Sequence, residues 1–260
     1  MPPTHPGLTA DHYLQAILQR EAVDTSLLSP VRGVEAILHP VIANWAGRAL
    51  LSTTPSGSFA KETANRSGTH IDLFISLTSL SPDTMKEIYE KLFHKMLVAG
   101  YEPERRNVSI RVRVSDYAVD LVPAKRKSAL ESDHRLYHRP TDSWIRTNVA
   151  AHIGHVHQAG RMQEIRILKL WRDQKRLYLP SFYLELTAIQ ALAGQPFGTL
   201  ADNVRTALAY LRDAFPTAAV VDPANAGNIV SNELTRDERN RIGAAAAHAL
   251  AEEEWARIVV

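Results

Sequence analysis

The sequence has no cysteine, no long apolar run and almost no net charge. The absence of cysteine among its 260 residues excludes a disulfide-linked partner and thiolate chemistry, and it suits a reducing compartment. No stretch approaches the roughly 20 apolar residues of a membrane span. The N-terminal Met-Pro-Pro-Thr-His-Pro lacks the charged-then-apolar order of a signal peptide. We therefore expect a cytoplasmic protein without membrane attachment. Because the formal charge is only +2, any contact with nucleic acid would have to come from a local basic patch.

The composition and the hydrophobic patterns predict a globular α+β protein. Hydrophobic residues make up 45% of the chain, which is enough for a sizeable core. Strand patterns and helices alternate in the first part, and only helical patterns follow Gly160. We expect a sheet braced by N-terminal helices in residues 1–150 and an all-helical domain in residues 151–260. The predicted helices span residues 11–23, 29–49, 81–100, 144–157, 161–176, 182–192 and 198–213, with a last helix from Thr235. Residues 1–8 are expected to form a tail and residues 124–143 a polar connection.

The residues from Gly57 to Leu77 combine a glycine-serine turn, a short polar helix and a strand. Gly57 permits a tight turn, and the amides that follow at the helix start form a seat for phosphate. In the strand, the side chains of His70 and Asp72 point to one face because strand side chains alternate with period two. A phosphate seat beside a carboxylate is what a metal-bound nucleoside triphosphate needs. The spacing alone is equally compatible with a plain turn and a surface aspartate.

A second carboxylate lies inside a predicted hairpin over residues 108–123. Alternating apolar residues form its first strand, and Ser115-Asp116 is a turn pair. Asp120 stands between Val119 and Leu121 in the second strand. Strands disfavour aspartate, so Asp120 is either a ligand-binding residue or an edge-strand residue that faces water.

Together these motifs resemble the nucleotidyltransferases of the DNA polymerase beta superfamily. In that family a Gly-Ser turn precedes an Asp-x-Asp strand, and a later strand supplies a third carboxylate. The closer resemblance is to the group of archaeal-type (class I) CCA-adding enzymes, oligoadenylate synthases and bacterial cyclic-oligonucleotide synthases. It extends to Asp120-Leu-Val-Pro-Ala, Ile165-Arg-Ile-Leu-Lys-Leu-Trp, Leu179-Pro-Ser-Phe-Tyr-Leu-Glu-Leu and Val221-Asp-Pro-Ala-Asn-Ala-Gly-Asn-Ile-Val. The resemblance implies a polymerase-beta-like core followed by a helical domain.

The resemblance also implies roles for individual residues. Asp72, Asp120 and His70 would hold Mg²⁺ or Mn²⁺ and carry catalysis. The residues that would bind the nucleoside triphosphate are Gly57, Ser58, Lys61, Lys169, Ser181, Phe182 and Tyr183. Lys169 would reach the β- and γ-phosphates, and Glu185 would orient it or pair with it. Each role has a structural alternative, because a lysine can extend from a half-buried face, a serine can cap a helix, and aromatic residues at a helix start often belong to the core.

His70 is the main departure from the family pattern, which has an aspartate at this position. A neutral imidazole is a poor ligand for Mg²⁺ but acceptable to Mn²⁺ or Zn²⁺. Three interpretations stay open. His70 ligates a softer metal, Glu62 lends the missing carboxylate, or the chain is a degenerate member that still binds nucleotides or RNA.

The sequence therefore leaves two function classes. The first is a template-independent nucleotidyltransferase that moves NMP from an NTP to a hydroxyl acceptor by a two-metal mechanism. The acceptor would be an RNA 3′ end, a nucleotide that becomes a linear or cyclic signal, or a small molecule. The second is a catalytically silent module that binds nucleotides or RNA. The residue at position 70 distinguishes the two classes.

Overall fold

The computed structural model describes residues 9–24, 26, 29–68 and 70–260, so the expected tail over residues 1–8 lies outside the described residues. The chain divides into two compact units. The sheet unit contains the described residues of Asp24–Glu62 and Thr69–Ile153, and the helical unit contains those up to Val23 together with Thr63–Gly68 and Gly154–Val260. The sequence places a boundary at residue 150. The structure separates the units at 153/154 and assigns two earlier segments to the helical unit.

The sheet unit is built on a mixed sheet with the strand order β1-β2-β5-β4-β3, to which β6 and β7 add beside β5. The strands are β1 (Leu50–Ser56), β2 (His70–Leu77), β3 (Glu104–Arg105), β4 (Ile110–Val114), β5 (Tyr117–Arg126), β6 (His134–His138) and β7 (Ser143–Thr147). Strands β2 and β5 are parallel, and every other pair is antiparallel. The predicted strand over residues 70–77 and the predicted hairpin, now β4–β5, are both confirmed.

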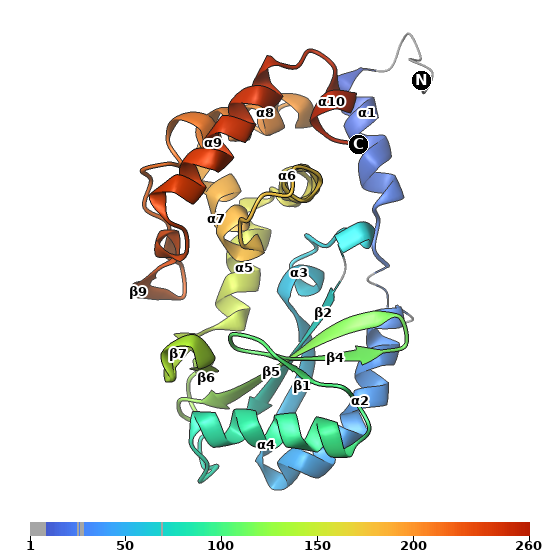
Figure 1. Ribbon diagram of the computed structural model, residues 1–260, viewed down its shortest axis with the longest axis vertical. Coiled ribbons are helices and arrows are strands. Elements are labelled where there is room, and N and C mark those ends of the chain that lie inside the picture. Colours follow the sequence, from blue (N-terminus) through green and yellow to red (C-terminus); the bar gives the residue numbers. More distant parts are fainter. Residues whose placement is uncertain (1–8, 25, 27–28, 69) are drawn as a thin grey trace. The chain divides into compact units, whose positions relative to one another are not determined.

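Two helices cover one face of this sheet (Figure 1). They are α2 (Pro30–Ala46) and α4 (Met85–Val98), which contact each other as well as the strands. The buried side chains of β2 at Ile71, Leu73, Ile75 and Leu77 belong to the core, and Leu77 lines a hollow with residues of both helices. The alternate positions of β2 are left to the opposite face, which places His70 and Asp72 away from the helical layer.

The helix ends follow local capping. Helix α4 begins at Met85, later than predicted, because Thr84 and Glu87 form a reciprocal capping box. Helix α2 runs through Pro40 to Ala46 and is followed by a 3₁₀ turn, Gly47–Ala49. The short helix α3 (Gly57–Ala60) follows β1 directly.

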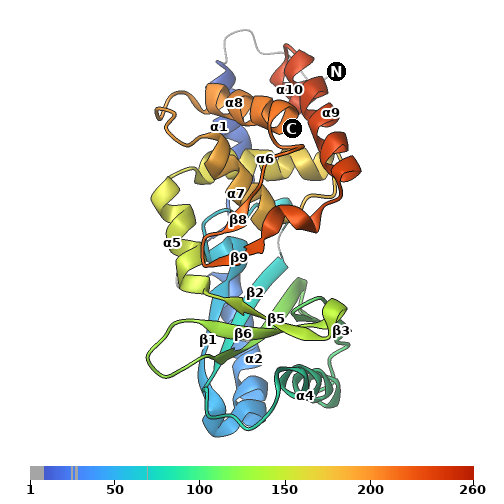
Figure 2. The same cartoon turned by 90° about the vertical axis from the view of Figure 1, so that its left-hand side faces the viewer.

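The helical unit has its own core. Its helices are α1 (Ala10–Arg20), α5 (Val149–Ala159, which begins in the sheet unit), α6 (Met162–Gln174), α7 (Ser181–Ala191), α8 (Leu200–Asp213), α9 (Arg236–Ala251) and α10 (Trp255–Ile258). Trp171, Tyr183 and Phe215 are the largest fully buried side chains of this core. Helices α8 and α9 pack side by side (Figure 2). A small hairpin of β8 (Val221–Asp222) and β9 (Asn225–Ile229) interrupts the expected all-helical pattern. The remaining 3₁₀ turns are Arg66–Gly68, Arg139–Thr141 and Val230–Glu233.

The segment from residue 124 to residue 147 is a second place where the predicted secondary structure was wrong. The expected polar connection and the start of the expected helix form β6 and β7. Strand β6 pairs with the end of β5, and β7 extends the sheet from β6. Trp144, expected to point inward from a helix, lies on β7 with 52% of its surface exposed. In this segment, backbone pairing with the edge of the sheet therefore outweighs the side-chain pattern that predicted a loop and a helix.

Among the helices of the described residues, none has the length and apolar character that crossing a membrane requires.

Candidate active site

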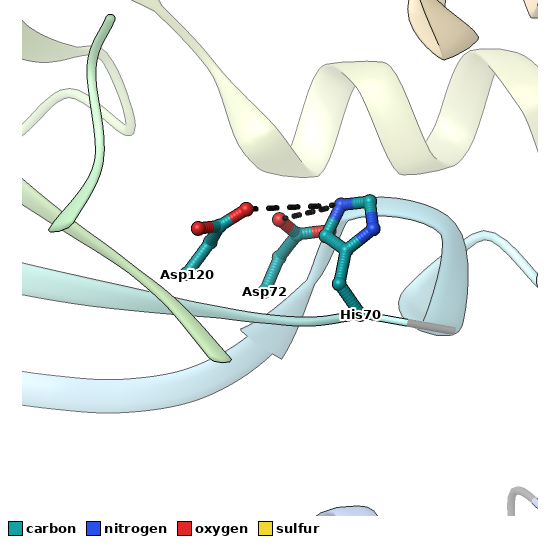
Figure 3. A group of neighbouring side chains, drawn as sticks. All are labelled: His70, Asp72 and Asp120. Atoms are coloured by element: carbon teal, nitrogen blue, oxygen red, sulfur yellow. Dashed lines mark ion pairs between the residues drawn. The ribbon is translucent and has the colours of Figure 1, made fainter. Parts of the chain in front are cut away.

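The parallel pairing of β2 and β5 places two carboxylates beside each other. Asp72 and Asp120 are register partners, so their side chains emerge on the same face of the sheet. His70 precedes Asp72 by two residues and shares that face. Figure 3 shows the three side chains pointing toward one another. The His70 Nε2 lies 3.5 Å from Asp72 Oδ1 and 3.9 Å from Asp120 Oδ2.

Asp120 is held in a two-point ion pair with Arg111. Arg111 donates from Nε to Asp120 Oδ1 at 2.9 Å and from its terminal nitrogen to Oδ2 at 2.6 Å. Asp120 is buried, whereas Arg111 is partly exposed on the neighbouring strand. Sequence reasoning missed Arg111. The signal was present, because Arg111 and Asp120 are equally distant from the predicted Ser115-Asp116 turn and are therefore cross-strand partners.

The three side chains are coupled electrostatically. The hydrogen bond to Asp72 raises the pKa of His70, burial opposes that rise, and the negative charges of Asp72 and Asp120 add to it. The ion pair with Asp120 likewise raises the pKa of Arg111. The positive charge of Arg111 therefore offsets part of the negative charge of the two carboxylates.

Gly57 lets the chain pass close to Asp72. Its φ is +58°, and a Cβ at this position would lie 1.8 Å from Asp72 Oδ2. Any other residue would clash with the carboxylate and would adopt a left-handed backbone. Glycine is therefore required for the turn and for the position of Asp72. Ser58 follows in α3, and Lys61 is buried at the end of that short helix.

The three residues suit a divalent cation. One ligand atom from each of His70, Asp72 and Asp120 lies within 4.8 Å of the others. Ligand atoms around one ion at about 2.1 Å lie roughly 3–4 Å apart, so a small contraction would close the site. One imidazole and two carboxylates favour Mn²⁺ or Zn²⁺ over Mg²⁺, which prefers oxygen ligands. Glu62, considered as a substitute carboxylate, is exposed and is not a member of this group.

Lys169 belongs to the helical unit and is buried there. Its Nζ lies 2.6 Å from Glu185 Oε1 and 2.9 Å from Thr63 Oγ1. Thr63 also donates to Glu185 Oε1 at 2.8 Å. The lysine and glutamate side chains are only 6% and 2% exposed. The expected ion pair between Glu185 and Lys169 is thus present. For Lys169 to contact a phosphate as expected, it would have to give up this ion pair.

The other predicted nucleotide-binding residues of the helical unit lie at the start of α7. Ser181 accepts a hydrogen bond from Arg172 at 3.0 Å. Phe182 is half-buried and packs against the core. Tyr183 is 0% exposed, and its ring lies 5.1 Å from that of Phe215. Tyr183 is therefore packed inside the core and has no exposed surface on which a base could stack, which corrects its assignment as a base-stacking residue.

Comparison with known proteins supports the same fold. No family model matches the chain. The CBASS oligonucleotide cyclase CdnC of Escherichia coli strain KTE188 is 24% identical over 237 residues, covering 77% of this chain and 74% of the relative. The CdnC:HORMA-deltaN complex of E. coli MS115-1 matches with a TM-score of 0.74 and 21% identity, over 92% of this chain and 89% of that chain.

A third likeness extends the comparison to another genus. The CD-NTase CdnG of Bradyrhizobium diazoefficiens, solved in complex with GTP, has a TM-score of 0.76 and 15% identity, with 94% of this chain and 91% of that chain covered. The solved structures match both the sheet and the helices along nearly the whole chain. The chain is therefore similar in sequence to a bacterial oligonucleotide cyclase, and it shares the fold of these solved structures, a mixed sheet braced by helices, as its motifs predicted.

Proposed function

We propose that the chain is a template-independent nucleotidyltransferase that joins NMP from a nucleoside triphosphate to the hydroxyl of a second nucleotide. The observation that supports this most is the register of Asp72 with Asp120, which brings two carboxylates and His70 together on one face of the sheet. A relative that is named an oligonucleotide cyclase favours a nucleotide acceptor over an RNA end.

His70, Asp72 and Asp120, together called the centre below, have a different role in the proposed reaction from Gly57. Asp72, Asp120 and the neutral Nε2 of His70 would hold a divalent cation. When bound, that cation neutralises triphosphate charge and lowers the pKa of the attacking hydroxyl. The Gly57 turn keeps Asp72 in place, and its close packing against the carboxylate limits the motion of the ligand.

The phosphate-binding residues act on the leaving group. Ser58 and Lys61 follow the Gly57 turn, and we assign them to the triphosphate. The acceptor hydroxyl loses its proton to water as its oxygen forms a bond to the α-phosphorus, and the bond from that phosphorus to the oxygen that bridges to the β-phosphorus breaks, which releases pyrophosphate. Lys169 would contribute to pyrophosphate binding only after exchanging its ion pair with Glu185 for a phosphate oxygen. Phe182, which is half-buried, stays the aromatic candidate for stacking on a base.

A catalytically silent nucleotide-binding protein is the second candidate. Two observations favour it: His70 stands where the family has a carboxylate, and Arg111 donates to both oxygens of Asp120. Loss of a metal-bridging carboxylate costs roughly 10³-fold or more in rate when nothing replaces it.

The experiment that separates the two candidates measures pyrophosphate release. The purified protein is incubated with each labelled NTP and with NTP pairs, in Mg²⁺ or Mn²⁺, and the products are identified by mass spectrometry. Asp72→Asn and Asp120→Asn are compared with Asp116→Asn, a control at the exposed hairpin turn. Activity that is lost in the first two variants and kept in the control supports the enzyme. Binding of labelled NTP without any turnover supports the silent protein.

A further inference from the structure

Arg111 lies beside Asp120 and therefore affects how many cations His70, Asp72 and Asp120 can hold together. It spans β4 to β5 and contacts both oxygens of Asp120. A carboxylate offers about four lone-pair sites, so Asp120 retains the capacity to ligate one cation while it is paired. Placing a second cation on Asp120 as well would bring that ion against the guanidinium, and like charges at such distances repel strongly.

His70 imposes a second limit on cation number. A two-metal centre places its ions about 3.5–4 Å apart, and ligands with two oxygens bridge them. The Nε2 of a neutral imidazole has a single lone pair and serves one ion only. Asp72 is then the one side chain of the group that is free to bridge, because Asp120 is shared with Arg111.

The formal charges lead to the same conclusion. Asp72 and Asp120 contribute two negative charges, Arg111 contributes one positive charge, and neutral His70 contributes none, so the cluster carries a net charge of −1. This charge can attract a divalent cation, but one bound cation already makes the cluster positive, which opposes a second.

We propose that Arg111 takes the place of a second cation at this centre, so that the protein itself binds one divalent cation per chain, held by His70, Asp72 and Asp120. The inference rests on the proposed function of the same site. It assigns to Arg111 a positioning role, because the guanidinium fixes Asp120 and sets the charge that a cation meets. Any further divalent ion arrives with the triphosphate, whose own oxygens bind it.

The test titrates Mn²⁺ into the nucleotide-free protein and counts bound ions by electron paramagnetic resonance of the free Mn²⁺. We expect one Mn²⁺ per parent chain and none for Asp72→Asn. Arg111→Met removes the guanidinium charge and should bind Mn²⁺ roughly tenfold more tightly or take up a second ion. Arg113→Met is the matched control, because Arg113 lies on the same strand, is exposed and pairs in register with Ala118.

The Mn²⁺ titrations of the parent and of the two arginine variants distinguish the proposed single-cation site from a two-cation site. Two Mn²⁺ ions in the parent, or equal binding by the parent and Arg111→Met, would overturn the proposal. An equal gain in Arg113→Met would attribute the effect to overall charge and would also overturn it. Circular dichroism of each variant checks folding, and the thermal stabilisation given by Mn²⁺ should be larger for Arg111→Met than for the parent. Because no nucleotide is present, these results stand whether or not the protein releases pyrophosphate, so failure of the proposed function is seen separately.

Discussion

Lys169 and Glu185 form a buried ion pair in the helical unit. Lys169 Nζ contacts Glu185 Oε1 at 2.6 Å and Thr63 Oγ1 at 2.9 Å, and almost none of the pair reaches solvent. Replacing one partner of such a pair leaves the other charge buried without compensation, which costs about 3–5 kcal/mol. We therefore expect Lys169→Met to lower the free energy of unfolding by that amount.

A double-mutant cycle isolates the contribution of the pair. Glu185→Gln removes the charge and keeps an oxygen that can accept from Thr63. The double variant Lys169→Met/Glu185→Gln leaves no unpaired charge, and it should regain about 2 kcal/mol or more of what the lysine variant loses. Lys175→Met is the control, because this lysine directly after α6 is exposed and donates to the backbone carbonyl of Arg257 at 3.0 Å. Its effect should stay within about 0.5 kcal/mol.

Urea unfolding followed by tryptophan fluorescence and by far-ultraviolet circular dichroism measures these changes. Two probes are needed because the chain has two compact units, which can unfold in separate steps. If Lys169→Met lost less than about 1 kcal/mol, or if the double variant were as unstable as the sum of the singles, the ion pair would not have the stabilising role inferred from its burial.

Three other substitutions test separate parts of the account. Gly57→Ala should lose Mn²⁺ binding, because the new Cβ would clash with the Asp72 carboxylate. Gly47→Ala is the control, because Gly47 has a similar φ but no atom within 4 Å of the added Cβ. In thermal unfolding it should lower the stability by only the roughly 1–2 kcal/mol that a left-handed backbone costs. Burial lowers the pKa of His134, so the folded state takes up this proton at lower pH than the unfolded state, and stability declines as the pH falls below about 6.5. His134→Gln should flatten that decline, by up to about 1.4 kcal/mol per pH unit in urea unfolding between pH 7.5 and 5; parallel curves for the two proteins would contradict the assignment. His70→Asp should raise the ratio of Mg²⁺- to Mn²⁺-supported pyrophosphate release about tenfold or more, and an unchanged ratio would show that His70 does not ligate the cation.

Local patterns were sufficient to predict the elements that carry the centre. Strand β2 has apolar residues at every second position, Ile71, Leu73, Ile75 and Leu77, so the shared face of His70 and Asp72 followed from period two. The turn at Ser115-Asp116 predicted the hairpin that contains Asp120. The Thr235–Glu238 capping box predicted the start of α9, and both of its hydrogen bonds are present.

Features that depend on distant partners could not be predicted in the same way. Strand β6 is rich in charged and histidine residues, and it forms because the end of β5 offers an unpaired edge. His134 lies on that strand with its Nε2 2.8 Å from Ser76 Oγ, a side chain 58 residues away in the sequence. The partner of Lys169 at Thr63 is separated from it by 106 residues. No local period encodes such contacts, because tertiary packing creates them.

The central claim is that the face shared by β2 and β5 carries nucleotidyl transfer. The most direct test is the initial rate of Mn²⁺-dependent pyrophosphate release from saturating NTP, for the parent and for Asp72→Asn under identical conditions. We expect turnover by the parent and a loss of roughly 10³-fold or more in the variant, because the variant lacks a charged ligand of the cation. Equal rates for the two proteins would contradict it and would place the chemistry elsewhere in the molecule.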